Sequence, residues 1–188
     1  MKRLVLSLAA CFAAVACTST QAYVTGIRPA AQPLHLEGAK IAVLSFRSSP
    51  GQPETGPSAS ELTIRGLTEQ LQATVISPSL VQAYLQEHAV VPSEYDRGPL
   101  ESLATSLGAD VVVWGSVNQF TPYSFDRFAP ATPPYVELTV HALRMGVSGI
   151  ASATARKQGS LPRTIRSRQP TFDDVAEEAI RELLLTFK

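Results

Sequence analysis

The C-terminal segment constrains the fold more than any other part of the chain. After Thr171, apolar side chains recur three or four residues apart, the spacing that places them on one face of an α-helix. They are Phe172, Val175, Ala176, Ala179, Ile180, Leu183, Leu184 and Phe187. Because such a helix owes most of its stability to the covering of its apolar face, the segment predicts a C-terminal amphipathic helix docked on other elements.

Four segments predict strands of the sheet on which this helix docks. Residues 41–46 are a short apolar run, which is typical of a strand buried on both faces. Residues 110–117 predict a central strand that is apolar on both faces at its start and half-buried later. From 136 to 142 apolar and polar residues alternate, as in an antiparallel strand with one wet face. A turn at 146–149 and a returning strand at 150–157 complete a hairpin.

Helices are predicted between the strands. Residues 58–61 (Ser-Ala-Ser-Glu) have the form of a capping box at the start of a helix over 59–72. A short strand follows at 73–77, and Pro78 suits the first turn of a second helix. A third helix follows Pro99 and ends at Gly108. Together these elements predict one α/β (α+β) domain over residues 39–188, with a mixed sheet of about five strands flanked by helices.

The first sixteen residues are typical of a cleaved secretory signal peptide. Lys2 and Arg3 precede an apolar run over residues 4–15, too short to span the roughly 30 Å hydrocarbon core as a helix. Residues 14–17 (Ala-Val-Ala-Cys) resemble a lipobox, so Cys17 is the expected lipidation site. A second match ends at Cys11 but leaves a shorter apolar run, and an ordinary signal peptide that uses neither cysteine is the remaining alternative.

Residues 17–38 are expected to form the lipidated cysteine and a flexible tether, because Ser, Thr, Gln, Pro and Ala follow one another without periodicity. The residue directly after Cys17 is Thr18 and not an acidic residue, so nothing here resembles the inner-membrane retention signal of enteric bacteria. The expected location is therefore the periplasmic face of the outer membrane. The formal net charge is +0, and loss of Lys2 and Arg3 makes it −2, so charge does not indicate a nucleic-acid partner.

Common catalytic motifs are absent from the sequence: there is no phosphate loop, no HExxH and no GxSxG. The three histidines are far apart in the sequence, at His35, His88 and His141. Four carboxylates lie in the first turns of the last helix, where they complement its dipole: Asp173, Asp174, Glu177 and Glu178. We expect no enzyme, cofactor, metal or small-molecule substrate; a solute-binding protein or an enzyme whose site the sequence does not reveal is the alternative.

Two segments are candidate contact surfaces. The irregular stretch at 121–134 and its flanks hold five of the thirteen aromatic residues: Phe120, Tyr123, Phe125, Phe128 and Tyr135. Loops seldom need so many rings, so contact with a membrane interface or another subunit is expected, with packing over the sheet as the alternative. Between Gly146 and Phe172 there is no acidic residue, and five cations predict a basic face: Arg156, Lys157, Arg163, Arg166 and Arg168.

The order of these motifs resembles the curli-secretion-channel superfamily of periplasmic α/β domains, which includes the Pel polysaccharide-export lipoprotein, the penicillin-binding-protein activator lipoproteins and the amino-terminal domain of TolB. The resemblance covers about residues 40–188 and is carried by KIAVLSF at 40–46 and by LGAD at 107–110 leading into 111–117. It implies a non-catalytic assembly or scaffold component of an envelope export complex, which forms homo-oligomers or binds an envelope protein.

One departure from the superfamily excludes a channel of the curli type. That channel inserts long amphipathic hairpins, and each strand of a transmembrane barrel needs about nine to eleven residues. The two candidate insertions here, residues 47–57 and 121–134, are short and interrupted by proline. An accessory or ring-forming subunit held by its lipid remains the expectation.

Overall fold

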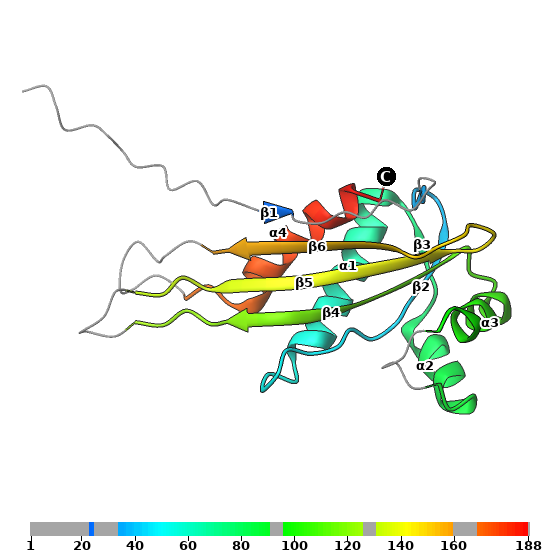
Figure 1. Ribbon diagram of the computed structural model, residues 1–188, viewed down its shortest axis with the longest axis horizontal. Coiled ribbons are helices and arrows are strands. Elements are labelled where there is room, and N and C mark those ends of the chain that lie inside the picture. Colours follow the sequence, from blue (N-terminus) through cyan, green and yellow to red (C-terminus); the bar gives the residue numbers. More distant parts are fainter. Residues whose placement is uncertain (1–22, 25–33, 91–95, 126–130, 160–168, 188) are drawn as a thin grey trace, which may run out of the picture.

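The computed structural model describes residues 23–24, 34–90, 96–125, 131–159 and 169–187. These residues form one mixed sheet with the strand order β1-β6-β5-β4-β2-β3 (Figure 1). The strands are β1 (Tyr23–Val24), β2 (Lys40–Val43), β3 (Thr74–Val75), β4 (Val111–Thr121), β5 (Tyr135–Arg144) and β6 (Ala151–Gln158). The helices are α1 (Thr55–Leu71), α2 (Pro78–Glu87), α3 (Arg97–Leu107) and α4 (Phe172–Leu185). Apart from the two-residue β1, this is the five-stranded α+β domain that the sequence predicts.

Helices cover the two faces of the sheet unequally. α1 and α4 pack together on one face, over apolar residues of β2, β4, β5 and β6. α2 and α3 lie on the other face and contact mainly β2 and the start of β4 (Figure 1). β2 pairs in parallel with β3 and β4, and the connections between these strands contain α1, α2 and α3, as parallel pairing requires a crossover. β4, β5 and β6 form antiparallel pairs and follow one another without an intervening helix.

The C-terminal helix is confirmed as an amphipathic element docked on the sheet. Its N-terminus carries a capping box in which Thr171 donates its backbone N–H to Asp174 Oδ2 at 2.7 Å. Its apolar face is buried against α1, where Gly66 permits close packing: a Cβ at this position would lie 2.6 Å from Leu184 Cδ1. Other local signals are confirmed as well, with Pro78 in the first turn of α2 and Gly108 as the left-handed C-cap of α3.

Helix α1 begins at Thr55, so the prediction that it starts at a capping box over residues 58–61 is wrong. Ser48 Oγ accepts the backbone N–H of Gly56 at 3.0 Å, which satisfies a donor of the first turn from outside the helix. Ser60, which lies inside the predicted box, accepts the backbone N–H of Phe46 at 2.8 Å. The loop from β2 therefore caps the helix, and local sequence does not encode this contact.

The folded domain also reaches further toward the N-terminus than the predicted tether allows. Leu34 and Leu36 are buried in the core beneath α1 and α4, at 3% and 0% exposure. Arg144 of β5 donates to the backbone carbonyls of Leu34 and His35. The boundary at residue 38 is corrected to residue 34 or earlier, because isolated leucines in a polar segment give no periodic signal.

Replacement of Leu183 by Asp should destabilise the domain by about 3 to 5 kcal/mol, because it places an unpaired carboxylate in the core. Leu183 is 0% exposed, whereas Leu185 on the same helix is 52% exposed. Leu185→Asp is therefore the matched control and should change the free energy of unfolding by no more than about 0.5 kcal/mol. Chemical denaturation of the two variants measures the difference; equal effects would show that α4 is not docked through Leu183.

Candidate functional site

The connection from β4 to β5 carries the sheet beyond the helices (Figure 1). Thr121 pairs with Tyr135, and beyond them Ser124 and Thr132 exchange two backbone hydrogen bonds of 3.1 and 2.8 Å. At the end of β6, Gly159 donates its backbone N–H to Pro134 O at 2.7 Å. We call this end of the sheet, described at residues 121–125 and 131–135, the tip.

The aromatic candidates do not form one surface. Phe125 at the tip is 60% exposed, and Tyr123 beside it is partly exposed. Phe120 is instead turned toward the core, where its ring packs edge-on against Phe172 at a centroid distance of 5.2 Å. A β-bulge between Val117 and Gln119 causes this turn, because one extra residue reverses the faces to which later side chains point. Phe120 is therefore removed from the predicted contact surface; Phe128 lies outside the described residues.

The basic face predicted from the sequence is divided between the two sides of β6. Arg156 points away from α4 and donates to Glu137 Oε2 on β5 at 2.7 Å. Arg163, Arg166 and Arg168 lie outside the described residues. The described part of the segment thus supplies one exposed cation, which is paired within the chain.

Lys157 does not contribute to an exposed basic surface, which corrects the expectation for this residue. Its side chain is 2% exposed and points toward α4, where the ammonium lies 2.8 Å from Glu178 and 3.0 Å from Glu182. Burial alone would lower the pKa of Lys157, but the hydrogen bonds to the two carboxylates outweigh it and raise the pKa. Lys157 therefore links β6 to α4 through two ion pairs.

Toward the tip, the face of β4, β5 and β6 opposite α1 and α4 carries polar side chains. We call it the open face; it comprises Ser116, Asn118, Gln119, Tyr135, Glu137, Thr139, His141, Ser152, Thr154 and Arg156. Hydrogen bonds of 2.7 to 2.9 Å link Ser116 to Asn118, Asn118 to Thr139, and Thr139 to Thr154 across three strands. The alternation in β5 predicted such a wet face, and the bulge adds Gln119 to it.

Glu137 lies between two partners on the open face. It accepts hydrogen bonds from Arg156 and from the Tyr135 hydroxyl, the latter at 3.2 Å. Burial alone would raise the pKa of Glu137, but the hydrogen bonds from Arg156 and Tyr135 outweigh it and lower the pKa. Burial, and then the hydrogen bond to Glu137, raise the pKa of Tyr135. The carboxylate is thus ionised and already satisfied, which does not favour a role in proton transfer.

His141 lies where the open face meets the layer formed by α2 and α3. Its ring stacks on Trp114 at a centroid distance of 5.4 Å, and Nδ1 lies 2.6 Å from the Ser152 hydroxyl. Burial lowers the pKa of His141 below its ordinary value. The imidazole therefore favours its neutral form in the folded domain.

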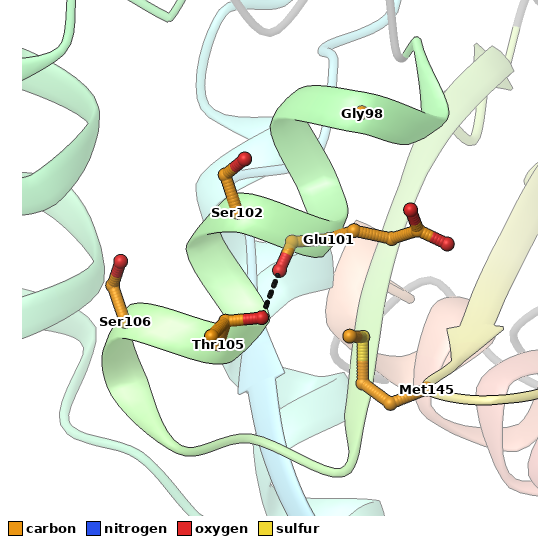
Figure 2. Close-up of a pocket in the computed structure, with 6 residues that line it drawn as sticks. All are labelled: Gly98, Glu101, Ser102, Thr105, Ser106 and Met145. Carbon is orange, nitrogen blue, oxygen red and sulfur yellow. Dashed lines mark hydrogen bonds between the residues drawn. The ribbon is translucent and has the colours of Figure 1, made fainter.

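A shallow hollow of about 590 Å³ lies along α3 beside the end of β5 (Figure 2). It is lined by Gly98, Glu101, Ser102, Thr105, Ser106 and Met145. Glu101 and Met145 extend to one side of the helix, while Ser102 and Ser106 lie on the other (Figure 2). The Glu101 carboxylate is paired with Arg97 at 2.6 Å. The polar groups that line the hollow point in different directions (Figure 2). In a typical solute-binding site such groups converge on one point.

Within the described ranges, no group of three or more His, Cys, Asp or Glu side chains is arranged to hold a metal ion. No helix in these ranges has the length and apolar character needed to cross a membrane. Cys17 and Cys11, the candidate lipidation residues, lie outside the described part of the chain.

The fold defines an α+β domain in which one mixed sheet is covered by two helices on each face. Solved structures with the same fold include the PelC dodecamer from Paraburkholderia phytofirmans, with 19% identity and a TM-score of 0.53 over 88% of this chain and 97% of that chain. A second PelC structure, of a dodecamer with one substitution in the PelC chain, has 20% identity and a TM-score of 0.55 over 89% of this chain and 98% of that chain.

The C-terminal domain of LpoB from Salmonella enterica has 15% identity and a TM-score of 0.50, over 66% of this chain and 84% of that domain. The predicted fold likeness to envelope α/β domains is therefore confirmed. No protein-family model matches the chain, and no curated protein sequence does either.

The free energy of unfolding should fall as the pH drops below about 6.5, the ordinary pKa of histidine. The unfolded chain takes up a proton at His141 near that pH, whereas the folded domain takes it up only at lower pH because burial lowers the pKa. His141→Gln should make the stability less dependent on pH between 6.5 and the folded pKa. Denaturation at a series of pH values tests this; an unchanged slope in the variant would contradict it.

Proposed function

We propose that the chain is a lipid-anchored periplasmic scaffold of the outer membrane, which acts by self-association or by binding an envelope protein and catalyses no reaction. The observation that carries the proposal is the fold shared with PelC. The match covers 97% or more of the PelC chain, and the PelC structures are of a dodecamer. The signal-like residues 1–16 and the lipobox at Cys17 support the anchor.

The geometry of the described surfaces agrees with a role in assembly. The open face consists of side chains bonded to one another, and the hollow on α3 is shallow with dispersed polar groups. The exposed ring of Phe125 at the tip is the feature most suited to contact another molecule, because aromatic residues are enriched both in interface cores and at membrane surfaces. A neighbouring subunit and the bilayer are the two candidate partners for it, and Arg163 and Arg166 remain candidate contacts from the sequence.

Assembly predicts that the lipidated protein in nanodiscs or detergent has a mass several times that of one chain, which has a mass of 20.1 kDa with its signal. Tethering raises the effective concentration, so a soluble form lacking the anchor should associate more weakly. Mass photometry, with crosslinking in cells, is the measurement. A strictly monomeric lipidated protein that crosslinks to no envelope partner would refute the scaffold role.

The anchor is tested by replacing each candidate cysteine. Cys17→Ser should abolish labelling by fatty acid and release the protein from membranes, because stable attachment needs the acyl chains. Cys11→Ser is the matched control and should leave labelling and fractionation unchanged. If Cys11→Ser alone releases the protein, Cys11 carries the lipid; if the wild type takes up no fatty acid, the protein is not a lipoprotein.

A further inference from the structure

The two-residue strand β1 fixes where the N-terminal segment meets the sheet. β1 pairs with β6 in antiparallel register, with Tyr23 opposite Arg156 and Val24 opposite Ala155. Since β6 runs from the β5–β6 turn toward the tip, β1 runs in the reverse direction, away from the tip (Figure 1). The chain therefore enters β1 from the side of the tip.

The number of residues before β1 limits where the lipid can lie. Cys17 precedes Tyr23 by six residues, which span at most about 20 Å when fully extended. Extended backward from Tyr23 along the line of β1, this length is sufficient to reach the tip, where Ser124 and Thr132 lie about five residues beyond the position of Glu137. The β5–β6 turn lies about as far away in the opposite direction, so reaching it requires a reversal that itself consumes residues. Six residues are too few both to reverse the chain and to cover the distance to the β5–β6 turn.

Without β1 the anchor would have no such restriction. The next described contact of the N-terminal segment is the pair of hydrogen bonds from Arg144 to Leu34 and His35, at the end of β5 far from the tip. Leu34 follows Cys17 by seventeen residues, which extend to about 60 Å and could place the lipid at any side of the domain. The pairing of β1 with β6 is thus what determines the orientation.

We propose that β1 orients the domain on the bilayer, with the tip toward the lipid headgroups and the β5–β6 turn away from them. This inference rests on the proposed lipid anchor and selects the bilayer as the partner of the tip. The side chains of the tip fit that partner independently of β1. Phe125 is the most exposed large apolar side chain among the described residues, and Tyr123 beside it has an apolar ring with a polar hydroxyl, as is typical of the interfacial region.

The test uses full-length, acylated protein in nanodiscs that contain nitroxide-labelled lipids. A fluorophore is attached to a cysteine introduced at the tip (Ser124→Cys) or at the β5–β6 turn (Ser148→Cys), two exposed serines. We expect the lipids to quench the label at position 124 several-fold more than the label at position 148. Equal quenching, or stronger quenching at position 148, would overturn the proposal.

Two further variants separate the strand from the aromatic ring. Tyr23→Pro with Val24→Pro removes backbone donors of β1 and should make the two labels equally quenched, while thermal unfolding shows that the core is intact. Phe125→Ser should reduce quenching at position 124, whereas Leu80→Ser, which removes a similarly exposed leucine from α2, should not. If Phe125→Ser instead lowers the mass of the assembly and leaves quenching unchanged, the tip contacts a neighbouring subunit.

Failure of the orientation is distinguishable from failure of the anchor. A protein that takes up no fatty acid and does not remain with the nanodiscs refutes the proposed function. A protein that is acylated and membrane-bound but shows equal or reversed quenching refutes the orientation alone.

Discussion

Burial of β4 on both faces is the constraint on which the rest of the structure depends. Residues 111–114 are at most 3% exposed, with Val111 and Val113 facing α1 and α4, and Val112 and Trp114 facing α2 and α3. A strand of this composition is stable only between two layers of helices. Beyond Trp114, polar residues appear on the second face and the helical cover ends.

Gly115 marks the change from a covered to an open sheet. A Cβ at this position would lie 2.4 Å from the Thr139 carbonyl oxygen and 2.5 Å from the ring of Phe46, so no larger residue fits without movement of the backbone. Ser116 follows on the open face, and the strands continue toward the tip with α1 and α4 on one side only. The open face and the tip therefore both begin where the apolar sequence of β4 ends.

The sequence predicted those elements whose signal is local and repeated, and missed those that depend on distant contacts. The stripe of α4 and the apolar run of β4 each carry enough periodic residues to define an element. Ser48 caps the start of α1 from outside the helix, Arg144 donates a hydrogen bond to the carbonyl of the buried Leu34, and a bulge turns Phe120 inward. None of these contacts has a pattern in the neighbouring residues.

Charge was the least reliable guide to the surface. Lys157 occupies a core-facing position of β6, since the alternation that buries Ala153 and Ala155 also points Lys157 inward. Its burial is tolerable because Glu178 and Glu182 on α4 supply two carboxylates, and removal of one member of such a buried group costs more than the group contributes. A count of cations along the segment cannot distinguish this residue from Arg156, which the same alternation directs to the opposite face.

If the tip of every copy faces the bilayer, the symmetry of an assembly is restricted. Two-fold axes parallel to the membrane would turn half of the tips away from it, so dihedral arrangements are excluded and only rotation about the membrane normal remains. In a two-fold dimer about the membrane normal, both copies use the same surface, whereas in any larger assembly neighbours must meet through two different surfaces and form a closed ring when the rotation closes. The contacts would lie on the flanks of the domain, among the open face, the outer surfaces of α1 and α4, and the layer of α2 and α3, which leaves Phe125 available to the lipid.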